Sequence, residues 1–234
     1  MGLDVYVGSL TRYLCGDWET VVQKWARETG RELQVIRQHN PPDAITEPAQ
    51  VLPAVLSWRD GLSRGLQQAG GPALDWDERP NAPYFTDKPA WDAYGDLILW
   101  TAYTEEGRVP PPVSSPENWH DDPELREARG RQTRYPNLLH GAEVWIPADF
   151  DFTFNAPWVT GDTITFGSSP QLIRELRLLN SRIWKASDQQ ITTWRLEGKE
   201  RHDSLEKGAK FALSLFLTLA VAAVANRLVM KLDY

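Results

Sequence analysis

The sequence predicts an α+β fold, with a mixed or antiparallel sheet packed against several helices, one of them a buried C-terminal helix. Strand-like runs rich in Val, Ile, Phe, Thr and Trp follow one another between residues 142 and 166, and helical patterns stand before and after them. A charge-free apolar run occupies 211–225. The chain has 234 residues and is 41% hydrophobic, so it can bury one large core. We expect residues 1–234 to form a single domain.

The N-terminal part has a strand–helix–strand pattern. Alternating apolar residues predict a strand over Leu3 to Leu10. A helix follows over 17–30, where Asp17 can cap the N-terminus and Gly30 ends the pattern. Residues 33–37 are typical of a second short strand. A βαβ unit is possible here, although its crossover is brief.

Two helices are expected in the middle of the chain, with an acidic and aromatic loop between them. The first covers Val51 to Gln68 despite Pro53 near its start. The loop has the sequence DWDERPNAPYFTDKPAW. Thr86 or Asp87 can cap the second helix, which accepts a proline in its first turn.

Residues 105–136 lose all periodicity and carry a run of three prolines. We predict a long irregular segment within the domain, because neither flank looks able to fold alone. Strands are then expected over 142–147, 150–159 and 162–166, the last two joined as a hairpin. A helix starts at Ser169, and Trp194 lies in a further short helix or connector.

The C-terminal helix contains a charge-free apolar run that Ser214 and Thr218 interrupt. No charged residue occurs from Phe211 to Ala225, between Lys210 and Arg227. A helix that spans a bilayer needs about 20 apolar residues, so this run is short for that role. A helix that is apolar on all sides must be buried. We therefore expect it to be the central helix of the domain, with no membrane association; a membrane anchor through this helix is the minor alternative.

Composition limits the compartment and the class of partner. The net charge of −7 argues against non-specific nucleic-acid binding and suits a basic protein partner. A single cysteine excludes an intrachain disulfide and fits a reducing compartment. The N-terminus lacks the pattern of a signal peptide. The expected location is the cytoplasm, and no cofactor is indicated.

The acidic loop is the predicted functional surface. Exposed aromatic rings can anchor a protein partner while neighbouring carboxylates attract a basic surface. Carboxylates beside aromatic rings also occur in glycosidase clefts, and a plain solvated loop is the other interpretation. The predicted partner-binding residues are Asp75, Trp76, Asp77, Glu78, Tyr84 and Asp87.

Two further positions could carry chemistry. Cys15 precedes the predicted helix N-terminus, where the helix dipole can lower the pKa of a thiol, but a buried small residue explains it as well and is the preferred interpretation. His120 with Asp121 and Asp122 could contribute to a metal site, although a solvated loop fits better because no paired ligand spacing exists. No phosphate-binding loop, dinucleotide fingerprint or nucleophile elbow is present.

Two stretches, GLDVYVGSLTRY at 2–13 and YFTDKPAWDAYGDLILW at 84–100, resemble an uncharacterised family of bacterial cytoplasmic proteins. The resemblance extends to the tail LVMKLDY at 228–234 and implies no activity or site residue. In general character the chain is similar to immunity proteins, which neutralise bacterial toxins. We expect a protein-binding inhibitor of this toxin–antitoxin type. The alternative is a hydrolase-like enzyme that uses Cys15 or the carboxylates around Trp76, with a metal near His120.

Overall fold

A six-stranded mixed sheet forms the middle layer of the protein, with strand order β2-β1-β6-β3-β5-β4. The computed structural model describes residues 3–32, 47–112, 118–198 and 204–234. The strand expected at 33–37 lies outside them. The strands are β1 Asp4–Gly8, β2 Phe85–Asp87, β3 Val144–Ile146, β4 Phe154–Pro157, β5 Thr163–Ser168 and β6 Val229–Asp233.

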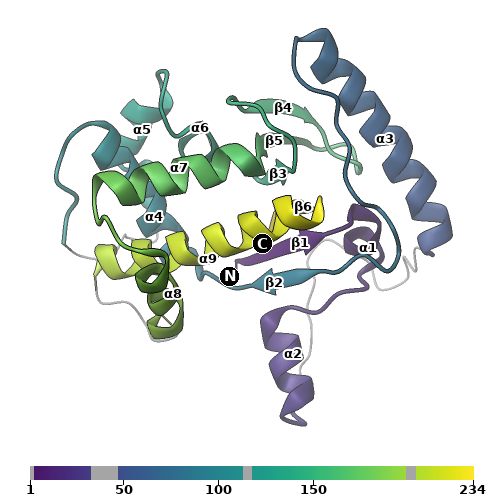
Figure 1. Cartoon of the computed structure of the whole chain (residues 1–234), viewed down its shortest axis with the longest axis horizontal. Helices are drawn as coiled ribbons and strands as arrows, with labels where there is room; N and C mark the ends of the chain where they lie inside the picture. The colour runs from purple at the N-terminus through teal and green to yellow at the C-terminus, as the bar shows by residue number, and fades with distance from the viewer. Residues whose placement is uncertain (1–2, 33–46, 113–117, 199–203) are drawn as a thin grey trace.

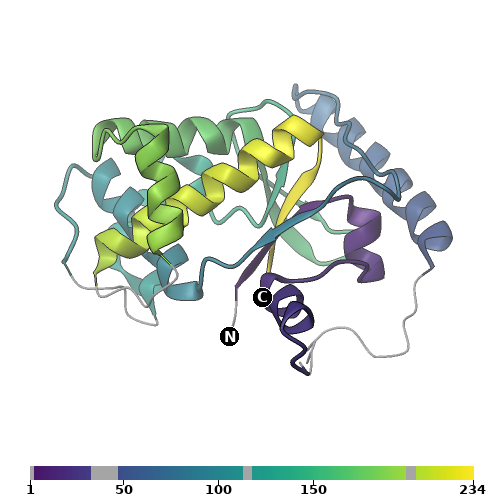
Figure 2. The same cartoon turned by 60° about the horizontal axis from the view of Figure 1, so that its bottom comes forward.

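Helices cover both faces of this sheet (Figures 1 and 2). One core cluster joins α4, α7, α8 and α9 to β1 and β6, and the other joins α1 and α3 to β3, β4 and β5. The described helices are α1 Leu10–Cys15, α2 Val21–Glu28, α3 Pro48–Gln68, α4 Trp91–Glu105, the 3-10 turn η1 Trp119–Asp121, α5 Pro123–Arg129, α6 Pro136–Leu139, α7 Ser169–Arg182, α8 Asp188–Glu197 and α9 Leu205–Asn226. The predicted α+β single domain is confirmed.

The strand β6 lies in the centre of the sheet, although no strand was expected there. It pairs antiparallel with β1 on one side and with β3 on the other. Its side chains alternate between the two faces of the sheet over only a few residues. Met230 and Leu232 face the core around α9, and Lys231 faces the opposite layer. Among the described strands, only β3 and β5 pair in parallel, and β4 leads into β5 through the predicted hairpin.

Several predicted boundaries are wrong, and local capping explains them. The first strand ends at Gly8, and the short α1 follows, capped by Ser9. Thr20, not Asp17, caps α2 through a capping box with Gln23. Asp87 ends β2 instead of capping a helix, and α4 begins four residues later at Trp91.

The segment 105–136 is less irregular than expected. It contains η1 and α5, and Asp122 caps α5 through a hydrogen bond from the Glu124 backbone N–H. Ion pairs tie this segment to the end of α4, for example Arg134 to Glu105 at 2.8 Å. Short capped turns replace hydrophobic periodicity here, which is why the sequence pattern does not reveal them.

The helix α9 is the centre of the larger core, as predicted. Ser204 caps it, and its side chains contact α4, α7 and α8. It is long and apolar enough to cross a membrane by composition, but most of it is buried inside the domain, which is consistent with a soluble protein. Phe216 is fully buried, stacked on Tyr94 with ring centroids 5.4 Å apart and edge-on to Trp145. Arg227 then adopts a left-handed conformation that reverses the chain into β6.

A glycine permits the close packing of α9 on α4. A Cβ atom at Gly208 would lie 1.9 Å from Asp96 Oδ2 and 3.1 Å from Asp96 Cβ. Asp96 is fully buried and cannot swing into solvent without opening the interface. The contact between the two helices therefore depends on the missing side chain at this position.

The Gly208→Ala variant should be less stable than the wild type by about 1–3 kcal/mol, because an extra methyl group overpacks a tight core. Gly61→Ala is the matched control, since Gly61 is exposed in the helix α3 and a Cβ there would meet no atom within 4 Å. The control should be neutral or gain up to about 1 kcal/mol through helix propensity. Urea unfolding of both variants measures this, and equal stability of the two would contradict the packing argument.

A buried carboxylate holds α6 against α7. Glu175 is 1% exposed and accepts hydrogen bonds from the Asn137 backbone N–H, the Asn137 amide and the Leu138 backbone N–H, at 3.1, 2.8 and 3.2 Å. The Asn137 carbonyl oxygen accepts in turn from the Ser168 backbone N–H at the end of β5. Burial raises the pKa of Glu175 to about 7, while these hydrogen bonds act in the opposite direction.

This carboxyl group should make stability depend on pH. Its pKa is higher in the folded chain than the ordinary value of 4.5, so the folded state holds the proton more tightly. Its contribution to the free energy of unfolding is greatest below pH 4.5 and is lost as pH rises toward 7. The loss is about 3 kcal/mol at 1.36 kcal/mol per pKa unit. Denaturant unfolding at pH 5 and pH 8 should show a smaller fall for Glu175→Gln than for the wild type; parallel falls would refute the assignment.

Candidate functional site

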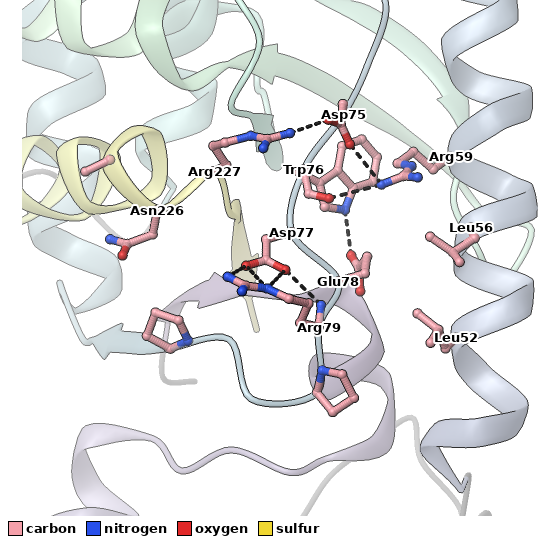
Figure 3. Close-up of a pocket in the computed structure, with 13 residues that line it drawn as sticks. Leu52, Leu56, Arg59, Asp75, Trp76, Asp77, Glu78, Arg79, Asn226 and Arg227 are labelled. Atoms are coloured by element: carbon pink, nitrogen blue, oxygen red, sulfur yellow. Dashed lines mark hydrogen bonds and ion pairs between the residues drawn. The ribbon is translucent and has the colours of Figure 1, made fainter.

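A groove lies between α3, the C-terminal end of α9 and the connecting segment 75–83 (Figure 3). We call the segment 75–83 the strap. The volume of the groove is about 810 Å³. Leucines of α3 and prolines of the strap supply apolar surface, and arginines and aspartates surround them. The lining residues are Leu52, Leu56, Arg59, Asp75, Trp76, Asp77, Glu78, Arg79, Pro80, Pro83, Ala225, Asn226 and Arg227.

Burial alternates along residues 75–79 of the strap, so these side chains face the core and the groove in turn. Trp76 is 2% exposed and Glu78 is 6% exposed, while Asp75 and Arg79 lie at the surface. The expectation that Trp76 is an exposed anchor is therefore wrong. Its ring packs edge-on against Trp58 of α3, with centroids 6.0 Å apart, and its indole N–H donates to Glu78. An acidic residue at an inward position concealed this alternation in the sequence.

Glu78 is buried because it caps α1. One carboxylate oxygen accepts from the Leu10 backbone N–H at 2.9 Å. The other accepts from the Thr11 backbone N–H at 2.9 Å and from the Thr11 hydroxyl at 2.8 Å. The first N–H groups of a helix have no intrahelical partner, and a carboxylate at this end also interacts favourably with the helix dipole. Glu78 therefore joins the strap to the start of the chain.

Replacing this carboxylate should destabilise the fold. Glu78→Gln presents an amide NH2 group to backbone donors and leaves at least one of them unsatisfied, which costs about 1–3 kcal/mol. Asp75→Asn on the same strap is the matched control, because its side chain is 65% exposed. Exposed ion pairs contribute about 0–1 kcal/mol. Thermal unfolding of the two variants at neutral pH measures the difference, and a Glu78→Gln variant as stable as Asp75→Asn would show that the cap is dispensable.

The acidic side chains on the groove side are balanced by arginines that come from distant parts of the sequence. Asp75 pairs with Arg59 of α3 at 3.4 Å and also with Arg227, which follows α9. Asp77 pairs with Arg79 at 2.6 Å, and this hydrogen bond lowers the pKa of Asp77. The rim therefore presents charges of both signs and is not the acidic patch that the loop composition indicates.

Arg79 and Arg227 are the most accessible arginines of this rim. Their side chains are 74% and 62% exposed. Arg227 is positioned by its left-handed backbone and by its carbonyl oxygen, which accepts from the Asp77 backbone N–H at 2.7 Å. Sequence reasoning missed both Arg59 and Arg227, since only the packing of α3 and α9 brings them to the strap.

Two of the predicted partner-binding residues lie outside the groove. Tyr84 stacks on Tyr6 with centroids 6.4 Å apart, and the Arg12 guanidinium lies 5.1 Å from the Tyr84 ring centroid. Asp87 accepts a hydrogen bond from Arg195 of α8 at 3.1 Å. The structure thus brings Asp75 and Asp77 together in the groove and separates them from these two residues.

The candidate catalytic positions have different surroundings from those expected. Cys15 ends α1 and does not precede a helix, so the helix dipole cannot lower its pKa. Burial, and then the charge of Asp17, raise the pKa of this thiol. His120 is exposed on η1, 3.9 Å from Asp121. Within residues 3–32, 47–112, 118–198 and 204–234, no three His, Cys, Asp or Glu side chains gather as a metal site.

Comparison with known proteins adds no relative. No family model matches the chain, and no curated protein or solved structure matches it either.

Proposed function

We propose that the protein is a protein-binding inhibitor of the immunity type, and that the groove beside the strap receives a segment of a basic toxin. The observation that carries this proposal is the groove itself: an open depression with apolar surface from Leu52 and Leu56 and a rim that carries Asp75, Arg79 and Arg227. Apolar contact area inside a charged, solvated rim is the usual composition of a protein-binding surface.

The strap gives this surface a fixed shape. Trp76 and Glu78 anchor it from the core side, so the outward residues need little ordering when a partner binds. Preorganisation of this kind reduces the entropic cost of association. The outward residues Asp75 and Arg79 alternate with the inward residues Trp76 and Glu78 along the strap.

The charges of the protein favour a basic partner both during its approach and at contact. The net charge of −7 favours the approach of a positively charged protein. At contact, a partner's lysine or arginine can replace Arg79 or Arg227 at the aspartates, since exposed ion pairs are worth only about 0–1 kcal/mol. The released arginines remain available for carboxylates of the partner.

The alternative of a hydrolase has less support. The groove lining contains no Ser, Thr, Cys or His among the described residues, so it offers none of these nucleophiles or bases. The Cys15 thiol has a raised pKa, and Glu78 uses both oxygens to cap α1. These observations favour binding over catalysis.

The proposal is tested with the product of the gene adjacent to this one in its genome. Co-expression should restore growth if that product is a toxin, and the purified proteins should bind. Asp75→Lys should weaken the complex roughly tenfold or more, because it removes a rim carboxylate and repels a basic surface. Asp151→Lys is the matched control: it makes the same charge change at an exposed residue outside the groove.

Calorimetric titration of both variants separates local contact from net charge. A loss confined to Asp75→Lys supports the groove as the interface. Equal losses of affinity in the two variants, or no loss in variants that remain folded, would place the interface elsewhere.

A further inference from the structure

A second, smaller cavity of about 190 Å³ lies where α4 begins, beside η1, the end of α5 and the end of β6. Four aromatic residues line it, namely Trp91, Tyr94, Trp119 and Tyr234. The Trp91 ring lies beside the other three, with centroids 5.7 Å from Trp119, 6.1 Å from Tyr234 and 6.2 Å from Tyr94. No lining residue of this cavity belongs to the groove beside the strap.

Two groups of opposite charge also line the cavity. Glu143 accepts a hydrogen bond from the Tyr234 hydroxyl at 2.6 Å, and Arg129 donates from Nε to the Leu139 carbonyl oxygen at 2.9 Å. Neither forms an ion pair within 4.0 Å with another residue of the described chain. Each is thus held in place while part of its charged group stays available.

Elsewhere in the protein, a similar set of aromatic rings and a carboxylate surrounds a lysine side chain. The ammonium group of Lys210 lies 5.3 Å from the Trp194 ring centroid and 5.9 Å from that of Trp184. It also pairs with Glu206 at 2.7 Å, and Glu206 accepts from the Trp184 indole N–H at 3.0 Å. Tryptophan rings and a carboxylate that is hydrogen-bonded to an aromatic side chain therefore surround a cation there.

In the second cavity, no lysine or arginine of the described residues lies over the four rings. Aromatic faces attract cations, and quaternary ammonium groups are commonly bound in cages of this composition. The guanidinium fork of Arg129 matches a carboxylate.

We propose that this cavity binds a small zwitterion of the amino-acid or betaine class. The cationic head contacts the aromatic rings and Glu143, and the carboxylate of the ligand pairs with Arg129. This site goes beyond the proposed inhibitor function and does not depend on it.

Ligand-detected NMR titration of the full chain tests the site with three probes: glycine betaine, tetramethylammonium and acetate. Betaine should bind most tightly, since it alone supplies both charges. Glu143→Gln should weaken betaine and tetramethylammonium by roughly tenfold, a typical loss for one charged contact. Arg129→Gln should weaken betaine by a similar factor and leave tetramethylammonium unchanged.

Two controls keep the outcome clear. Arg126→Gln removes an exposed charge from the same helix, outside the cavity, and should leave all three affinities unchanged. Asp75→Lys should do the same, so failure of the groove proposal does not affect this one. The proposal is overturned if no probe binds saturably to folded wild-type protein, or if Arg129→Gln weakens tetramethylammonium as much as betaine.

Discussion

The burial of α9 is the constraint on which the rest of the structure depends. The helix crosses one face of the sheet and contacts α4, α7 and α8, so it organises most of the larger core. Its close approach to α4 requires Gly208, and its end requires Arg227 in a left-handed conformation. That reversal places β6 between β1 and β3. One short segment therefore supplies both the central helix and the central strand.

The strap shows how a buried charge can shape a surface. Glu78 is retained inside because the N–H groups of α1 need an acceptor, and Trp76 completes the contact. With these two side chains fixed, Asp75 and Asp77 face outward at set positions, where Arg59, Arg79 and Arg227 meet them. The inward side of the strap caps α1, and this contact fixes the outward side that forms the groove.

Sequence patterns predicted the parts of the fold that carry their own signal. The helices α3, α7 and α9 are long and periodic, and the hairpin of β4 and β5 has turn residues between two strands. The helix α1 was missed because it has six residues and depends on Glu78, which is distant in the chain.

The candidate site was predictable only in part, for the same reason. Asp75 and Asp77 were expected at the surface: the Asp75 side chain is 65% exposed, but the Asp77 side chain is only 12% exposed. The inward turn of Trp76 and the arrival of Arg227 both depend on tertiary packing. Composition counts charges in a segment, but it does not show which opposite charges the fold will bring to them.

The central position of β6 has a consequence for how the chain folds. The pairing of Val5 with Leu232 joins the two extremes of the described chain, which is about as non-local as a contact can be. Until residues 229–233 have been synthesised, β1 and β3 each expose an unpaired edge, and such edges can pair with other chains. The sheet is therefore completed late in synthesis. A chain that terminates before these residues exposes two unpaired strand edges instead of forming one continuous sheet.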